Sequence, residues 1–266
     1  MKFSVVTPSY NQASFLRENV ESVLRQRKDG YDIEHIVIDG GSTDGTREIL
    51  ESYPHLIWVS EPDRGQADAV NKGFARATGE IVGWINSDDY YVDGAFSRVA
   101  EFLVHNLDID MVYGRCRLVD TDSRFLREWN PTEFKWNYLV WRGASLIPQQ
   151  TVFLRRRVIE SMEYMCDVTI QDAMDYDLWL RIGRRFRVRK IDRVLACFRL
   201  HAAAKTAIRP LLQWQESRMA RDRYNPYGPI ITRIGCCYYL ARRVCEKIVQ
   251  KFSESASDDL PRPRGD

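Results

Sequence analysis

The stretch EHIVIDGGSTDGT at residues 34–46 decides how this chain folds. Residues 34–39 (EHIVID) form a short apolar run rich in β-branched residues, which predicts a buried strand. The polar loop GGSTDG then leads into a helix predicted over residues 46–53. A strand, a loop and a helix in this order form the unit from which parallel sheets are built.

The same unit recurs on both sides of this stretch. Further strands are predicted at residues 2–8, 56–60 and 81–86, and further helices at residues 14–26, 66–77 and 94–105. Strands that alternate with helices predict right-handed crossovers. We therefore expect an α/β fold with a Rossmann-like, mostly parallel sheet and helices on both faces. Ligands of such sheets bind beyond the carboxyl ends of the strands, where the polar loops of this chain lie.

The pattern changes after residue 109. Residues 109–119 and 125–129 predict a hairpin, and an aromatic-rich segment follows at 134–141. The remaining predicted elements are a strand at 151–155, a helix at 172–185 and two short strands within 187–199 that Asp192 separates.

Composition excludes several classes of protein. A chain of 266 residues with 44% hydrophobic residues and seven Trp is folded, not disordered. It has no apolar run of about 18 residues, and its first residues turn polar too early for a signal peptide, so we expect a cytoplasmic protein. The six cysteines form no CxxC pair, so we expect reduced thiols and neither a zinc site nor a disulfide framework.

The end of the chain differs in charge from the rest. The net charge is only +2, but basic residues outnumber acidic ones after Leu200. Residues 230–252 combine helical apolar spacing with basic residues, which predicts an amphipathic helix. This helix could attach the protein to the inner face of a membrane, cover a homodimer interface or pack on the rest of the chain. We expect residues 253–266 to be disordered, and the scattered basic residues disfavour nucleic acid as a partner.

The loop from Asp39 to Thr46 places carboxylates, hydroxyls and three glycines between a strand and a helix. Glycines permit close backbone approach, and a carboxylate at a strand end accepts hydrogen bonds from a base or a ribose, so the loop suits a nucleotide. The alternative is a turn in which Asp44 or Thr46 caps the next helix. The loop is neither a GxGxxG motif nor a P-loop.

A second cluster, NSDD at residues 86–89, follows the strand predicted at 81–86. Adjacent buried carboxylates repel each other unless a cation or protons compensate them. Hard oxygen ligands select magnesium or manganese, so Asp88 and Asp89 indicate a divalent metal site. The alternative is helix capping by one of the two.

Three further features are open to two interpretations. Asp68 and Lys72 lie one helical turn apart, so they form either a plain salt bridge or part of a site. Asp172, Asp175 and Asp177 suit the first turn of a helix and would equally supply a general base. His201, a lone histidine after the last strand, is either structural or functional.

Six motifs occur in one order along residues 2–205: TPSYN, DGGSTDGT, SEPDRGQADAVNKG, NSDD, DYDLWLRI and FRLH. In this order the chain resembles the inverting glycosyltransferases of family 2, which have the GT-A fold, and in particular those of bacterial polysaccharide biosynthesis. The resemblance implies a nucleotide-sugar donor, usually a UDP-sugar, and a divalent metal, manganese or magnesium, at a DxD-type motif. It also implies a glycan or a lipid-linked molecule as the sugar acceptor.

The resemblance assigns roles to individual residues. It implies that Pro8, Tyr10 and Asp39 line the pocket for the base and ribose, with Asp68, Lys72, Asn86 and Ser87 completing the donor site. Asp88 is implied as the principal metal contact, together with Asp89 and His201. Asp175 is the best match to the catalytic base, and Asp177 is the alternative. The chain departs from the family at Asn86 and Met174, where many relatives have Asp and Glu.

These observations predict a glycosyltransferase domain at residues 1–205, with a nucleotide-sugar-binding half (1–106) and an acceptor-binding half (107–205). Residues 206–252 would form a helical extension. The predicted reaction is a metal-assisted single displacement with an Asp base. A nucleotidyltransferase would need a basic, glycine-rich loop where this chain has PSYNQASF. A binding protein that has lost its catalytic base is the other alternative.

Overall fold

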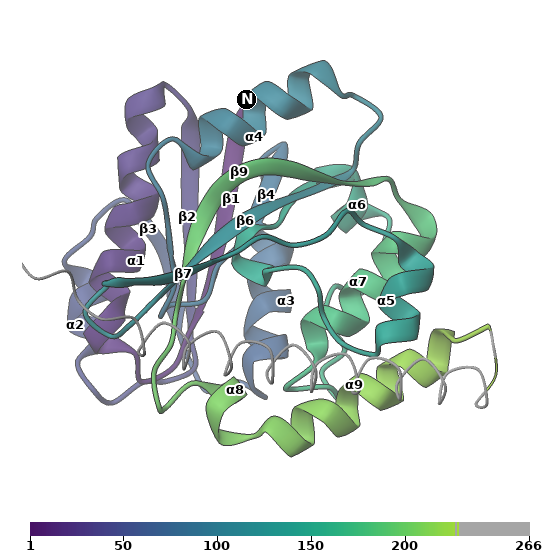
Figure 1. The fold of residues 1–266 in the computed structure, drawn as a ribbon. Coiled ribbons are helices and arrows are strands. Elements are labelled where there is room, and N and C mark those ends of the chain that lie inside the picture. The colour runs from purple at the N-terminus through teal and green to yellow at the C-terminus, as the bar shows by residue number, and fades with distance from the viewer. Residues whose placement is uncertain (227, 229–266) are drawn as a thin grey trace, which may run out of the picture.

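The computed structural model describes residues 1–226 and residue 228, and these form a mixed sheet with helices on both sides (Figure 1). The strands are β1 (Lys2–Ser9), β2 (Asp32–Asp39), β3 (Leu56–Ser60), β4 (Ile81–Trp84), β5 (Tyr90–Tyr91), β6 (Met111–Val119), β7 (Phe125–Trp129), β8 (Phe153–Arg155) and β9 (Val188–Arg199). The helices are α1 (Ala13–Arg25), η1 (Gln26–Asp29), α2 (Thr46–Glu51), α3 (Gln66–Arg76), α4 (Ala95–His105), α5 (Trp136–Arg142), η2 (Gln149–Thr151), α6 (Arg156–Glu160), α7 (Met174–Arg185), α8 (Lys205–Ile208) and α9 (Pro210–Tyr224).

The first half of the sheet has the order β3-β2-β1-β4, with every neighbouring pair parallel. This confirms the α/β prediction for the repeated units. Side chains of β2 alternate between the two faces, as a strand buried on both sides requires. Ile36 and Ile38 pack on the side of α3, whereas Ile33 and Val37 pack on the side of α1.

The two faces have separate apolar cores. Helices α1, α2 and α4 cover one face, and α3, α5 and α7 cover the other. Helix α3 lies unusually close to β1, because a Cβ at Gly73 would overlap Cγ1 of Val6. This close packing holds the second half of α3 against β1.

The second half of the sheet is mixed. Strand β8 pairs antiparallel with both β4 and β6, and β6 pairs parallel with β9. The predicted hairpin is confirmed, since β6 pairs antiparallel with β7. The expected break at Asp192 is wrong, because residues 188–199 form one continuous strand. The register with β6 shifts between Tyr113 and Arg115, so a bulge, with Asp192 exposed, replaces the expected break.

The last described helix, α9, packs against α7 (Figure 1). The helix expected at 230–252 and the disorder expected at 253–266 lie outside the described residues, and the division at residue 205 stays a prediction. Cys116, Cys166 and Cys197 are buried, free thiols. Within residues 1–226, no helix is long and apolar enough to cross a membrane.

Candidate functional site

Asp39 anchors the loop at the end of β2. Its side chain is fully buried, and its carboxylate accepts hydrogen bonds from the backbone N–H of Ser42 (3.0 Å) and from the hydroxyl groups of Ser42 (2.5 Å) and Ser60 (2.6 Å). Ser60 ends the neighbouring strand β3. Asp39 therefore holds the ends of two parallel strands and the loop between β2 and α2 in one arrangement.

This loop lies against the residues that follow β1. A Cβ at Gly40 would lie 2.7 Å from Oδ2 of Asp63 and 3.3 Å from the ring of Tyr10, so a larger residue here would displace the Asp63 carboxylate. Pro8 is buried and pairs with Ile38 across β1 and β2, whereas Tyr10 is 62% exposed. The structure thus brings together the three residues predicted to line a base and ribose pocket, and it adds Asp63.

Asn11 and Asp44 complete this corner. The backbone N–H of Asn11 donates to the hydroxyl of Ser42 (2.7 Å), and its side-chain oxygen accepts from the backbone N–H of Thr43 (2.9 Å). Asp44 accepts from the first residues of two helices, Ala13 of α1 (2.9 Å) and Thr46 of α2 (3.1 Å). Burial raises the pKa of Asp44, but these hydrogen bonds outweigh it and lower the pKa overall. The capping alternative is therefore confirmed for Asp44.

Asp68 and Lys72 connect α3 to the loop before it. Nζ of Lys72 lies 2.9 Å from Glu61 and 3.4 Å from Asp68, and Asp68 also accepts from the guanidinium of Arg64 (3.0 Å). The predicted salt bridge is present. A role of Asp68 and Lys72 in donor binding stays a prediction.

The NSDD segment joins α3 through a side chain that the sequence did not single out. The side-chain oxygen of Asn86 accepts from Nε2 of Gln66 (2.7 Å) and from the indole of Trp84 (3.1 Å). Nζ of Lys205 donates in turn to Oε1 of Gln66 (3.0 Å). Ser87 is buried. Two donors therefore hold Asn86. Lys205, from the segment after β9, is linked to Asn86 through Gln66.

Asp88 and His201 form a pair across the sheet. Nε2 of His201 lies 3.0 Å from Oδ2 of Asp88, and the imidazole packs on the ring of Phe15 at 4.9 Å between centroids. The Asp88 side chain is 18% exposed. This contact unites two of the three residues that were predicted to hold a metal.

Asp89 points into the protein. Its Oδ1 accepts from the backbone N–H of Arg199 (2.9 Å), and its Oδ2 is buried with no hydrogen-bond partner among the described residues. Burial raises the pKa of Asp89 well above its ordinary value, and the charge of Asp88 adds to the effect.

Arg199 is the buried centre of this region, a role that the FRLH motif alone did not reveal. Its guanidinium donates to the backbone oxygens of Asp88 (3.0 Å) and Thr121 (2.9 Å) and to the carboxylate of Glu18. It also lies over the ring of Phe15, 4.9 Å from the centroid. The guanidinium therefore fixes the backbone that carries Asp88.

These side chains fit a divalent cation that is shared with a substrate. The accessible carboxylate of Asp88 and the imidazole of His201 lie in contact, whereas Asp89 is buried and bonds the backbone of Arg199. Residues 1–226 hold no group of three or more His, Cys, Asp or Glu that could bind a metal by themselves. Magnesium and similar ions commonly take one or two carboxylates and complete their shell with phosphate oxygens and water.

Helix α7 begins at Met174, two residues later than expected, and carries the candidate bases in its first turn. Asp177 is fully buried, and its Oδ2 accepts from Nε of Arg181 (2.9 Å). Asp175 is half-buried. Burial raises the pKa of Asp175, opposed by hydrogen bonds from the Tyr176 backbone and Ser145.

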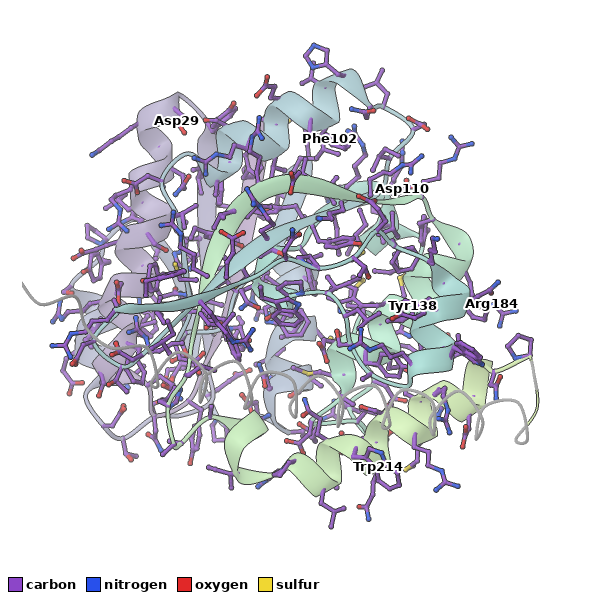
Figure 2. The ribbon with its side chains drawn as sticks, in the orientation of Figure 1. Asp29, Phe102, Asp110, Tyr138, Arg184 and Trp214 are labelled. Atoms are coloured by element: carbon purple, nitrogen blue, oxygen red, sulfur yellow. The ribbon has the colours of Figure 1, made fainter. Side chains whose placement is uncertain are left out.

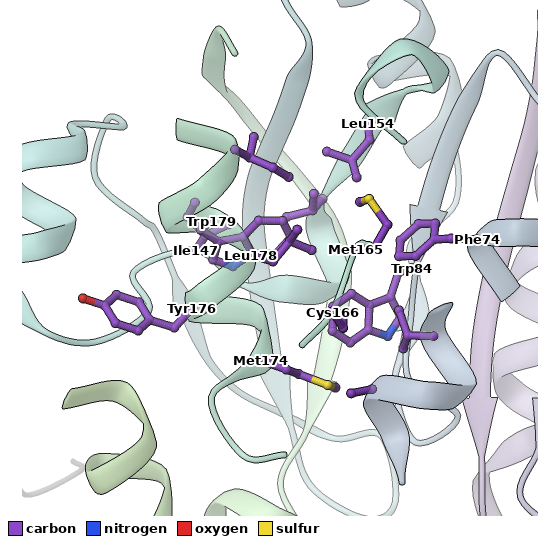
Figure 3. Packing of buried hydrophobic residues seen from close by; sticks show 14 of the residues in the cluster. Phe74, Trp84, Ile147, Leu154, Met165, Cys166, Met174, Tyr176, Leu178 and Trp179 are labelled. Atoms are coloured by element: carbon purple, nitrogen blue, oxygen red, sulfur yellow. The ribbon is translucent and has the colours of Figure 1, made fainter. Parts of the chain in front are cut away.

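Met174 explains one departure from the family pattern. Its side chain is 5% exposed and belongs to the apolar cluster that also holds Trp84 and Cys166 (Figure 3). A Glu at this position would bury its carboxylate in an apolar core. Met174 therefore anchors the start of α7 in the apolar cluster. Asp175, the next residue, is half-buried.

The start of α7 also contacts the donor half. Nε2 of Gln171 donates to the backbone oxygen of Arg64 (3.1 Å), immediately before α3. The clusters at β2, at β4 and at α7 are thus linked through α3 along one edge of the sheet. A parallel half-sheet with polar loops at this edge is typical of nucleotide-binding α/β proteins.

The chain belongs to glycosyl transferase family 2, whose profile matches residues 4–162. It is 37% identical over 107 residues to the putative teichuronic acid biosynthesis glycosyltransferase TuaG of Bacillus subtilis, covering 38% of this chain and 41% of that protein. It is 35% identical over 136 residues to a glycosyltransferase of Nostoc sp., covering 46% and 41%. The match thus spans less than half the length of either relative.

Solved structures share the fold. Staphylococcus aureus TarS in complex with UDP-GlcNAc aligns with a TM-score of 0.62 at 18% identity, over 90% of this chain and 72% of that chain. The mannosyltransferase PcManGT of Pyrobaculum calidifontis, in complex with GDP-Man and Mn²⁺, aligns with a TM-score of 0.56 at 18% identity, over 98% and 81%. These likenesses confirm the GT-A-like fold.

Proposed function

We propose that this protein transfers a sugar from a nucleoside-diphosphate sugar, most simply a UDP-sugar, to a hydroxyl group of a glycan or lipid-linked acceptor. The observation that carries the proposal is that the loop after β2, the NSDD segment and the segment before α7 all contact residues 63–66 at the start of α3. Family membership and the UDP-GlcNAc and GDP-Man complexes of the structural neighbours support a nucleotide-sugar donor.

In this proposal the nucleoside lies at the β1–β2 corner. Tyr10 offers an exposed aromatic face for the base, with the Asp63 carboxylate close to it, and the buried Asp39 holds the loop that forms this corner. The diphosphate extends toward the loop after β4. Asp88 and His201 would hold a divalent metal there, which supplies charge neutralisation of the leaving diphosphate.

Asp175 is the proposed general base. A sugar hydroxyl is a weak nucleophile, so its proton must pass to a base as the bond to the anomeric carbon forms. The Asp175 carboxylate accepts this proton, the bond from the anomeric carbon to the phosphate oxygen breaks, and the nucleoside diphosphate leaves with the electron pair. Attack from the face opposite the leaving group inverts the anomeric centre. We prefer Asp175 to Asp177, because Asp177 is buried against Arg181.

The experiment is a donor screen. The protein is incubated with UDP-sugars and GDP-mannose in Mn²⁺, and the released nucleoside diphosphate is measured. We expect release from one donor class and its loss in Asp88→Ala, whereas Asp122→Ala, an exposed carboxylate in the β6–β7 turn, remains active. Donor binding without release, in the presence of candidate acceptors, would instead support a non-catalytic binder.

A further inference from the structure

A carboxylate from α9 occupies the amino-terminal end of α7. Oε2 of Glu216 accepts hydrogen bonds from the backbone N–H groups of Gln171 (3.0 Å), Asp172 (2.6 Å) and Ala173 (3.0 Å), the three residues directly before the helix. Glu216 is only 9% exposed. The N-cap residue of α7 makes no side-chain capping bond of its own. Glu216 therefore pairs the N–H group of the N-cap residue Ala173 and those of the two residues before it from a different helix.

Helix α9 is fixed to this region at a second point. Nη1 of Arg223, two turns beyond Glu216, donates to Asp167 (2.6 Å) and lies 3.9 Å from Oδ1 of Asp177. Ser217 and Ala220 are buried on the same side of α9, whereas Trp214 is 55% exposed on its outer side (Figure 2). One face of α9 thus carries the contacts to α7.

The segment that Glu216 holds leads directly to the candidate base. Asp175 is the second residue of α7 and follows Ala173 by two positions. Gln171, at the other end of the segment, bonds the backbone oxygen of Arg64 before α3. The position of Asp175 relative to the donor loops therefore depends on residues 171–173, and their backbone N–H groups converge on one oxygen of Glu216.

We propose that Glu216 is a positioning residue that sets Asp175 in its reactive place, and this inference rests on the proposed function of Asp175 as the base. Glu216 acts through the backbone of residues 171–173. Helix α9 then belongs to the transferase domain, because one of its residues positions the base.

The first test is Glu216→Leu, which removes the oxygen and keeps a side chain of similar size. The readout is release of nucleoside diphosphate from UDP-GlcNAc or GDP-mannose, whichever the protein uses. We expect kcat to fall at least tenfold with the donor KM within about twofold, because the donor loops belong to the other half of the sheet. Gln215→Leu, at the exposed neighbouring position, should keep the kcat of the unmodified protein. Unchanged kcat in Glu216→Leu would overturn the inference.

The second test asks whether Glu216 acts through Asp175. Glu216→Gln keeps a carbonyl oxygen that can accept the same N–H groups, so it should retain kcat within about threefold. In an Asp175→Asn background, Glu216→Leu should cause no further loss. A further loss there as large as in the unmodified protein would assign Glu216 a role apart from the base and overturn the inference.

Folding is measured alongside by circular dichroism. If Glu216→Leu does not fold, Glu216→Asp takes its place, since it withdraws the carboxylate by one methylene; the same tenfold loss is expected, and unchanged kcat would overturn the inference. Asp175→Asn alone tests the proposed function. Unchanged kcat in Asp175→Asn would remove the base and the positioning role together, whereas a loss in Asp175→Asn with none at Glu216 would remove only the latter.

Discussion

Nε2 of His201, just beyond the end of β9, lies 3.0 Å from Oδ2 of Asp88, in the loop after β4. The two residues are 113 positions apart in the chain. Their contact brings the parallel half of the sheet and its last strand together at one point. In the proposed reaction, the charge of the departing diphosphate is neutralised at this point.

Removing either member of this pair should weaken metal-dependent binding of UDP. In Asp88→Ala we expect the Kd of UDP with Mn²⁺ to equal its Kd in EDTA. For His201→Ala we expect a smaller loss of Mn²⁺ affinity than for Asp88→Ala, because the Asp88 carboxylate remains. Calorimetric titration of UDP with and without Mn²⁺ measures both, with Asp122→Ala as the unchanged control. Equal Mn²⁺ dependence in Asp88→Ala and the unmodified protein would remove Asp88 from the metal site.

The two carboxylates of α7 should respond differently to substitution. Asp175→Asn should lower kcat by about 10²–10⁴-fold with donor affinity retained, since general base catalysis is typically worth this much. Asp177→Asn should mainly lower stability, by about 3–5 kcal/mol, because it leaves the guanidinium of Arg181 without its buried partner. Steady-state kinetics and urea unfolding separate the two effects. A larger kcat loss in Asp177→Asn at unchanged stability would reverse the assignment.

Arg199→Met should destabilise the fold by roughly 1–3 kcal/mol for each buried acceptor that loses its donor. The substitution leaves the backbone oxygens of Asp88 and Thr121 without their donor and removes the ring contact with Phe15. Arg193→Met, an exposed position on the same strand, should stay within about 0.5 kcal/mol. Thermal and urea unfolding check both, and equal stability of the two variants would refute the structural role of Arg199.

The free energy of unfolding should decrease at low pH, because Glu34 becomes protonated. Glu34 lies at the edge of the sheet opposite the site. Burial raises the pKa of Glu34, but hydrogen bonds from Ser4 and Thr78 outweigh it and lower the pKa from 4.5 to about 2. A pKa lowered in the folded state stabilises the protein above the unfolded pKa, and this contribution is lost as the pH falls from about 4.5 toward 2. It amounts to roughly 3 kcal/mol.

The variant Glu34→Gln should therefore lose stability at pH 7 and show a flatter stability curve between pH 5 and pH 2. Urea unfolding across this range measures the curve. Glu163→Gln, at an exposed position, should keep the slope of the unmodified protein. A slope in Glu34→Gln as steep as in that control would show that other carboxylates carry the acid sensitivity.

The parts of the fold that the sequence predicted are those with a local pattern. The four parallel strands of the first half each combine a short apolar run with a polar loop, and this combination fixes both the element and the edge on which the loop lies. The strand β9 was misjudged at Asp192, because the bulge there arises from pairing with β6 and has no signature in β9 itself.

The same distinction applies to the site. Asp39, Asp88 and Asp175 stand directly after a strand or at a helix start, so their positions were readable from the sequence. Gln66 begins α3, but its partner Asn86 lies 20 residues away and no local pattern indicates this contact. The partners of Glu216 lie 43 to 45 residues away, in the segment before α7. Only the packing of α3 and α9 reveals these contacts.

The buried guanidinium of Arg199 joins segments of the chain that are synthesised at different times. Its partners include Ser123, 76 residues earlier, and Glu18, 181 residues earlier in the chain. During synthesis, Glu18 and Ser123 are therefore present long before β9, which supplies the guanidinium that bonds them. The proposed site is therefore complete only after β9, which carries Arg199, and the segment with His201 have been synthesised.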